Sequence, residues 1–283
     1  MNILFCGDKN IADGVMMSLI SLTDYHTEPL NVYVLTMGVE TDKGLFEPLD
    51  NSFAEFMNVF LKEKNPRSSF TLIDMTKEFV ADFPVANAET RFTPGCMLRL
   101  YADSVSSLPS KILYLDNDVL CRGSIKELYN TDMNDTELAG TLDYYGRWFF
   151  RNNIFKMDYL NSGVLLLNMD KIRETDLFTR CRQRCREKQM FMPDQSALNK
   201  LAVSKKILPR KFNEQRKLRR DTVLQHFTTS FRFFPYIRTV TVKPWHIDKV
   251  RSVLGLYCYD DLYSRFSQLK EQYTDYIKKE ICI

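Results

Sequence analysis

One stretch decides the fold: Lys111-Ile-Leu-Tyr-Leu-Asp-Asn-Asp-Val-Leu120. Residues 112–115 are wholly apolar and include β-branched and aromatic side chains, which is typical of a strand buried on both faces. Asp116 and Asp118 follow directly, and an ionised carboxylate that is buried without a partner costs many kcal/mol. We therefore expect both carboxylates at the carboxyl edge of a sheet, where α/β proteins bind their ligands.

The two carboxylates carry hard oxygen donors, with Asn117 between them. Such donors suit Mg²⁺ or Mn²⁺ that holds a substrate phosphate. The alternative is an ordinary turn after a strand, because Asp and Asn are common turn residues. The triplet alone does not separate these two interpretations.

Strands and helices are predicted to alternate along most of the chain, which indicates βαβ units and a mostly parallel sheet. We expect strands at 2–6, 31–36, 70–73, 112–115, 137–142 and 164–168, and helices at 11–22, 44–62, 94–105, 124–129, 171–189 and 196–202. The predicted fold is one α/β domain over residues 1–250, with a single twisted Rossmann-like sheet and helices on both faces.

The tail, residues 251–283, is predicted to be a helical extension. Its apolar residues recur every three or four positions and form one stripe, at Leu262, Phe266, Leu269, Tyr273 and Tyr276. We expect this stripe to pack on the domain or on a second subunit, so a homo-oligomer stays open.

Composition limits the kinds of partner. The 283 residues carry a net charge of only +3, and no apolar run approaches the ~18 residues that a membrane span requires. The first residues show no secretory signal, and the seven scattered cysteines are typical of reduced thiols in a cytoplasmic protein. The basic segment 205–220 predicts a solvated face rather than a nucleic-acid site, while peripheral contact with anionic lipid at the inner membrane face stays open.

The chain offers carboxylates and amides at predicted strand ends rather than a nucleophilic triad. It lacks a Gly-x-Ser-x-Gly elbow, a P-loop and a Gly-x-Gly-x-x-Gly fingerprint, and it has three histidines. His226 follows a short apolar run and is either a structural histidine or a third ligand, which would favour Mn²⁺ over Mg²⁺. Lys243, in Lys-Pro-Trp-His, is either part of a packed turn or a point charge against phosphate.

Several short motifs, each weak alone, form a specific set in this order along the chain. They are Asp8-Lys-Asn10, Leu98-Arg-Leu100, Leu113-Tyr-Leu-Asp-Asn-Asp118, Leu160-Asn-Ser-Gly-Val-Leu165, Pro193-Asp-Gln195, His226 and Lys243-Pro-Trp-His246. With them the chain resembles the retaining glycosyltransferases of family 8, the bacterial galactosyl- and glucosyltransferases that include the glycogenin branch, over most of residues 1–250.

The resemblance implies a GT-A fold and a hexosyltransferase that uses a UDP-hexose donor, UDP-glucose or UDP-galactose, with Mn²⁺ (or Mg²⁺). The acceptor would be a saccharide or a glycolipid, as in the synthesis of lipopolysaccharide. The implied metal ligands are Asp116, Asp118 and His226. The implied nucleotide and diphosphate contacts are Asp8, Asn10 and Lys243, to which we add Asn117. The residues expected around the transferred sugar are Arg99, Asp143, Asn161, Asp194 and Gln195.

The chain departs from the family pattern at residues 227–242, which form a long insertion rich in aromatic residues between His226 and Lys243. It leaves open whether both residues reach one site, and we expect its aromatic side chains to cover the acceptor.

Retention of configuration at the anomeric carbon permits two routes. One uses a protein nucleophile, Asp194 or Gln195, and the other, which we favour, is attack by the acceptor from the leaving-group face. The alternative function is a degenerate nucleotide-sugar binder or membrane-surface scaffold without turnover. A phosphatase is disfavoured because the order of its acidic motifs is reversed in this chain. A nucleotidyltransferase is disfavoured because the glycine- and lysine-rich first loop of that class is missing.

Overall fold

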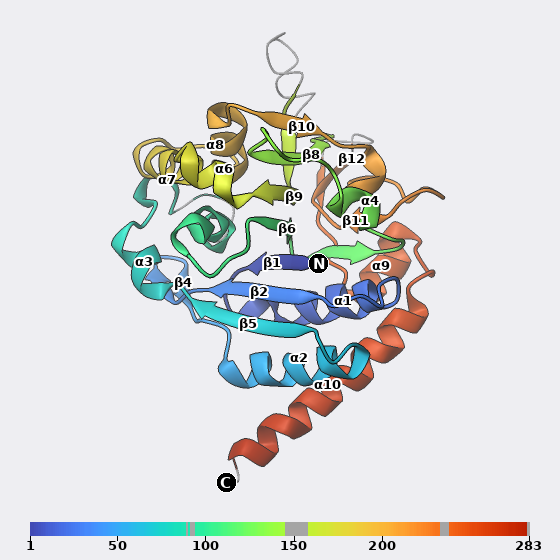
Figure 1. Cartoon of the computed structure of the whole chain (residues 1–283). Coiled ribbons are helices and arrows are strands. Elements are labelled where there is room, and N and C mark those ends of the chain that lie inside the picture. The colour runs from blue at the N-terminus through green and yellow to red at the C-terminus, as the bar shows by residue number, and fades with distance from the viewer. Residues whose placement is uncertain (89, 91–93, 145–157, 233–237, 282–283) are drawn as a thin grey trace.

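The computed structural model describes residues 1–88, 90, 94–144, 158–232 and 238–281. Its centre is a seven-stranded sheet with the strand order β10-β8-β9-β6-β1-β2-β5 (Figure 1). The strands are β1 (Asn2–Cys6), β2 (Asn31–Thr36), β5 (Ser69–Asp74), β6 (Lys111–Leu115), β8 (Leu138–Leu142), β9 (Leu160–Asn168) and β10 (Lys205–Ile207). Strand β9 runs antiparallel to β6 and β8, and the other neighbouring pairs are parallel. The predicted single, mostly parallel sheet is therefore confirmed.

Helices cover both faces of the sheet, so its central strands are buried on both sides. The helices of one layer are α1 (Ala12–Thr23), α2 (Asn51–Lys64) and α10 (Asp260–Ile281), and those of the other are η3 (Pro94–Ser104), α6 (Met169–Glu174), α7 (Leu177–Glu187) and α8 (Pro193–Leu201). Along β6, Leu113 and Leu115 pack in the first layer and Ile112 and Tyr114 in the second, as the two-residue period of a strand requires.

Shorter elements complete the described part of the chain. They are η1 (Lys9–Ile11), β3 (Val39–Thr41), β4 (Gly44–Phe46), α3 (Thr76–Ala81), η2 (Val85–Asn87), β7 (Val119–Cys121), α4 (Lys126–Tyr129), η5 (Arg210–Phe212), β11 (Leu224–His226), β12 (Ser230–Arg232), β13 (Arg238–Val240) and α9 (Ile247–Leu254). Among the helices that the structure describes, none combines the length and the hydropathy needed to cross a bilayer.

Three predicted helices differ from the structure. The first turns of the predicted helix 44–62 are replaced by strand β4, and α2 begins only at Asn51, where the Asp50 side chain accepts a hydrogen bond from Ser52 N. The segment that begins at Pro94 is a 3₁₀ helix. The predicted helix 171–189 is two helices, because Asp176 between them has a left-handed φ of 53°.

The basic segment 205–220 also differs from the prediction of a solvated face, because part of it is buried. Its charged side chains at Arg216, Lys217, Arg219 and Arg220 are exposed, but residues 212–215, directly before them, are buried. Glu214 N donates to Leu224 O, and His226 N donates to Glu214 O, so the segment lies against β11 as an additional partner. A charge count could not reveal this buried interior.

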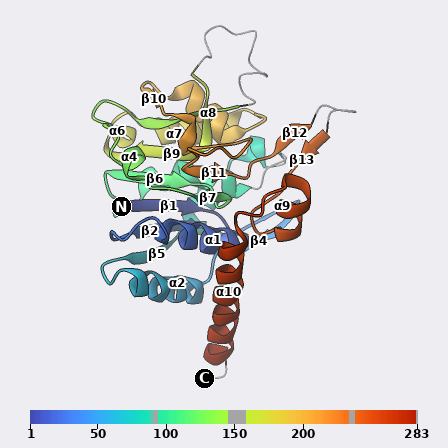
Figure 2. The same ribbon diagram turned by 90° about the vertical axis from the view of Figure 1, so that its right-hand side faces the viewer.

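The C-terminal helix α10 lies across α1 and α2, and its end projects past α2 (Figures 1 and 2). Its apolar stripe faces the domain: Phe266 is buried in the core of the first layer, and the Tyr273 ring meets the Phe53 ring edge-on at 5.4 Å. Arg265 forms an ion pair with Asp24 at the end of α1. The helix therefore shares its apolar core with the domain.

We predict that Phe266→Ala lowers the free energy of unfolding by about 3 kcal/mol, because the substitution removes a buried aromatic side chain and leaves a cavity. Urea denaturation measures this loss, with Gln268→Ala on the exposed face of the same helix as the control. Equal midpoints for the two variants would show that α10 contributes no stability to the domain.

Candidate active site

The two carboxylates after β6 lie at the carboxyl edge of the sheet. Strand β6 ends at Leu115, and Asp116 N donates to Gly163 O at 2.8 Å, which continues the pairing with β9 for one residue. The chain then turns, because Val119 N donates to Asp116 O, and Asp118 leads into β7. The Asp118 side chain is almost completely buried, whereas a quarter of the Asp116 side chain is exposed.

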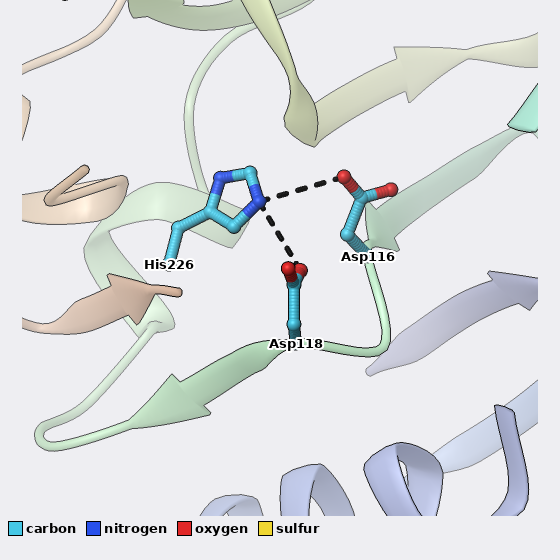
Figure 3. Close-up of side chains that lie close together, drawn as sticks. All are labelled: Asp116, Asp118 and His226. Carbon is cyan, nitrogen blue, oxygen red and sulfur yellow. Dashed lines mark ion pairs between the residues drawn. The ribbon is translucent and has the colours of Figure 1, made fainter. Parts of the chain in front are cut away.

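His226 completes a cluster with these carboxylates (Figure 3). It is the last residue of β11, which pairs antiparallel with β7 and sets His226 opposite Val119. Its Nε2 lies 3.2 Å from Asp118 Oδ1 and 3.6 Å from Asp116 Oδ2. One ligand atom from each of the three residues lies within 4.8 Å of the others. Neighbouring ligands of an octahedral cation with bonds of about 2.1 Å lie about 3 Å apart, so the three groups can share one ion with little movement.

The remaining carboxylate oxygens are held by other side chains. Asp116 Oδ1 accepts hydrogen bonds from Arg99 Nη2 at 2.9 Å and from the Tyr114 hydroxyl at 2.6 Å. Asp118 Oδ2 forms an ion pair with Lys243 Nζ. Each carboxylate is thus fixed through one oxygen and presents the other oxygen to His226.

The charges inside the cluster shift its pKa values in opposite directions. Burial favours the neutral acid of Asp118, but Lys243 and His226 outweigh burial and hold the pKa of Asp118 well below its usual range. Burial disfavours the imidazolium of His226, but Asp118 outweighs it and raises the pKa of His226. Asp118 is therefore an anion that attracts cations at neutral pH.

A second group of polar side chains lies beside the cluster, around the start of β9. Asn161 Nδ2 donates to Asp143 Oδ2 at 2.8 Å, and Gln195 Nε2 donates to the same oxygen at 3.2 Å. Gln195 Oε1 accepts from Ser162 N at 3.0 Å. Asp194 Oδ2 accepts from the Ser162 hydroxyl at 3.2 Å. These buried groups satisfy one another and leave a polar wall that a ligand with several hydroxyls could contact.

Arg99 connects the two groups. Its guanidinium stacks 4.1 Å above the Tyr114 ring and donates to Ser162 O, while it pairs with Asp116 on one side and with Asp194 Oδ2, at 3.2 Å, on the other. Burial raises the pKa of Asp194, and Arg99 limits the rise. The positive charge of Arg99 between Asp116 and Asp194 offsets the repulsion between these carboxylates, which explains how they can lie so close together.

Nine of the twelve predicted site residues line one cavity. They are Arg99, Asp116, Asp118, Asp143, Asn161, Asp194, Gln195, His226 and Lys243. The other three, Asp8, Asn10 and Asn117, are outside this lining. Asp8 caps η1 directly after β1, and because β1 pairs with β6 in parallel, it lies at the same sheet edge. Asn117 places its main-chain oxygen against α1, where only a glycine, Gly14, leaves room for it.

The insertion 227–242 does not separate His226 from Lys243 in space. Strands β12 and β13 pair as an antiparallel hairpin, and the hydroxyls of Thr229 and Thr241 lie 2.9 Å apart at its base. The chain consequently returns to the site, where Lys243 contacts Asp118. Phe233, Phe234 and Tyr236, part of the predicted aromatic cover, are outside the described residues.

Sequence reasoning missed several residues of the site. Cys96, Phe191, Met192, Thr228 and Thr229 also line the cavity. Tyr114 and Asn213 contact the predicted ligands from behind. Tyr114 could have been suspected, because alternation along β6 places it on the same side as Asp116, but Asn213 lies in the basic segment and no local pattern marks it.

Comparison with known proteins identifies the family. Residues 2–249 match the model of Glycosyl transferase family 8. A lipopolysaccharide 1,3-galactosyltransferase of Salmonella typhimurium is 25% identical over 87% of this chain and 73% of its own length. The lipopolysaccharide glucosyltransferase WaaO of Escherichia coli is 29% identical over 51% of this chain and 47% of its own.

Solved structures confirm the fold. The galactosyltransferase LgtC, in complex with donor and acceptor sugar analogues, superposes with a TM-score of 0.64 at 22% identity, over 96% of both chains. An active-site mutant of LgtC gives a TM-score of 0.67 at 21% identity, again over 96% of both chains. The GT-A fold expected from the sequence is therefore confirmed.

Gly163 provides a test of the cluster. A Cβ at this position would lie 2.1 Å from His226 Cε1 and 2.8 Å from Asp116 Oδ2, so one of the two side chains must move. We predict that Gly163→Ala weakens Mn²⁺ binding, measured by titration calorimetry, and lowers the free energy of unfolding by about 1–3 kcal/mol.

Gly123→Ala is the matched control, because its Cβ would meet the nearest atom, Val223 Cγ2, at an ordinary distance of 3.7 Å. If Gly163→Ala binds Mn²⁺ as tightly as the Gly123→Ala control, then close packing of His226 and Asp116 is not required for the site.

Proposed function

Because the chain belongs to glycosyltransferase family 8, we propose that it transfers glucose or galactose from a UDP-sugar to a saccharide or glycolipid acceptor, with retention of configuration. The observation that carries the proposal is the position of Asp116, Asp118 and His226 in the same cavity as the polar wall around Asn161. A relative that acts on lipopolysaccharide with galactose, and another with glucose, support the class of sugar and acceptor.

The donor atoms of the cluster fit a divalent cation. Two carboxylate oxygens and one imidazole nitrogen converge, and the imidazole favours Mn²⁺ over Mg²⁺. Asp116, Asp118 and His226 would hold the ion. When bound, such an ion neutralises the negative charge that develops on the diphosphate as the sugar leaves.

Lys243 is suited to assist the leaving diphosphate. Its ammonium carries three N–H donors, and its contact with Asp118 uses only one of them. Burial lowers the pKa of Lys243, but Asp118 outweighs burial and raises it, so the side chain stays charged. Lys243 can therefore keep its carboxylate partner and donate to a phosphate oxygen at the same time.

The polar wall is suited to hold the sugar. Asp143, Asn161 and Gln195 can exchange hydrogen bonds among themselves for bonds to sugar hydroxyls, and the nearby Asp194 carboxylate favours positive charge at the anomeric carbon. Asp194 is engaged by Arg99 and Ser162, and Gln195 is a neutral amide, which makes both weak nucleophiles. We therefore favour attack by the acceptor from the leaving-group face, with a diphosphate oxygen taking the proton of the acceptor hydroxyl.

We predict that UDP-glucose or UDP-galactose raises the melting temperature of the protein in the presence of Mn²⁺, and does so much less in EDTA. A ligand at 100 times its Kd adds about 2.7 kcal/mol to the stability of the native state. Release of UDP in the presence of an acceptor distinguishes turnover from binding alone. Stabilisation without UDP release across a broad acceptor panel would favour the degenerate binder instead.

We predict that Asp118→Asn lowers the rate of metal-dependent transfer by about 100-fold or more, because it removes an anionic ligand while preserving shape. Circular dichroism checks that the variant folds. Asp24→Ala is the control, since Asp24 forms a surface ion pair with Arg265 at the far end of α1. Transfer by Asp118→Asn at the rate of the control would contradict the metal assignment.

A further inference from the structure

Asn213 is a buried amide directly behind His226, and the mechanism above does not use it. It is completely buried, and its Oδ1 lies 3.2 Å from His226 Nδ1, the ring nitrogen that faces away from the carboxylates. Its Nδ2 donates to Asn161 Oδ1 at 2.9 Å. Both polar ends of the Asn213 side chain therefore contact residues of the site.

The orientation of the neighbouring Asn161 amide is fixed by the main-chain N–H of Gly163, whose role cannot be exchanged. The main-chain N–H of Gly163 can only donate, and it lies 3.0 Å from Asn161 Oδ1. Asn161 Oδ1 must therefore be the acceptor, and Nδ2 the donor. With the oxygen so assigned, Asn161 Nδ2 donates to Asp143 Oδ2 at 2.8 Å.

The orientation of the Asn161 amide determines that of the Asn213 amide, and the Asn213 amide in turn determines which nitrogen of His226 carries a proton. Asn213 must present its Nδ2 to the Asn161 oxygen, so its own Oδ1 faces His226. An amide oxygen can only accept, and His226 Nδ1 must therefore carry a proton. A neutral imidazole with a proton on Nδ1 has its lone pair on Nε2, the atom 3.2 Å from Asp118.

We infer that Asn213 is a positioning residue that holds His226 in the tautomer able to bind a cation through Nε2. Without an acceptor behind the ring, the carboxylates of Asp116 and Asp118 would favour a proton on Nε2, and that tautomer has no lone pair for the ion. This inference rests on the proposed function, because it concerns the cation that the proposal assigns to this cluster. It extends the proposal by adding a residue that touches neither the cation nor the sugar.

The test is the affinity for Mn²⁺ alone, without nucleotide, measured from the electron paramagnetic resonance signal of free Mn²⁺. Asn213→Leu removes the acceptor at similar volume, and we expect binding about 10- to 100-fold weaker. Asn213→Asp keeps an oxygen opposite Nδ1, and we expect affinity closer to that of the unsubstituted chain. Should Asn213→Leu fail to fold, Asn213→Ala removes the same acceptor without adding volume, and the same weakening is expected.

Asn168→Ala is the matched control, because Asn168 lies at the opposite end of β9 and caps α6. We expect it to lower the melting temperature and to leave Mn²⁺ affinity unchanged. Unchanged affinity in Asn213→Leu overturns the inference and leaves the metal site intact. Equal weakening in Asn213→Leu and Asn213→Asp also overturns it, because the acceptor oxygen would then be irrelevant. No Mn²⁺ binding by the unsubstituted chain overturns both the inference and the proposed function.

Discussion

Two carboxylates at the end of a buried strand are the constraint on which the rest of the site depends. Asp118 is buried and anionic, and such a group is tolerated only when positive charge or donors surround it. Asp118 obtains them from His226 and Lys243, and the neighbouring Asp116 obtains them from Arg99 and Tyr114, so four separate segments contribute. Arg99 arrives from η3, Tyr114 from β6 itself, His226 from β11 and Lys243 from beyond the β12–β13 hairpin. The site is therefore assembled by the whole fold rather than by one loop.

The same constraint explains why small residues lie where they do. Gly163 leaves no Cβ between the His226 ring and Asp116, and Gly14 leaves room for the turn at Asn117. Larger side chains at these positions would push apart the groups that must converge. The Asn-Ser-Gly sequence after Leu160 is thus as much a packing requirement as a set of polar contacts.

Much of this was predictable, because local sequence patterns carry it. The strands at 2–6 and 31–36 agree with the structure to the residue, and nine predicted site residues line one cavity. Strand-end carboxylates and amides are recognisable because a parallel sheet brings the ends of separate strands to one edge. Two predictions missed local features: β4 forms a short hairpin with β3 where a helical turn was predicted, and the left-handed Asp176 divides α6 from α7.

Asn213 shows most clearly what could not be predicted from the sequence. It lies among eight Lys and Arg residues in a segment whose composition predicts a solvated surface, yet it is buried and bonded to His226. No periodicity or motif marks it, because its role comes from side-chain contacts with His226, 13 residues away, and with Asn161, 52 residues away. The insertion 227–242 is a second case, since its length left open whether His226 and Lys243 reach one site, and its hairpin pairing brings both to the same site.

The central claim is that Asp116, Asp118 and His226 hold one divalent cation. Crystals grown with Mn²⁺ and UDP test it most directly, through anomalous scattering at the manganese edge. We expect a single strong peak within about 2.3 Å of Asp116 Oδ2, Asp118 Oδ1 and His226 Nε2. A manganese peak elsewhere, with Lys243 still paired to Asp118 and no density between the three side chains, would contradict it.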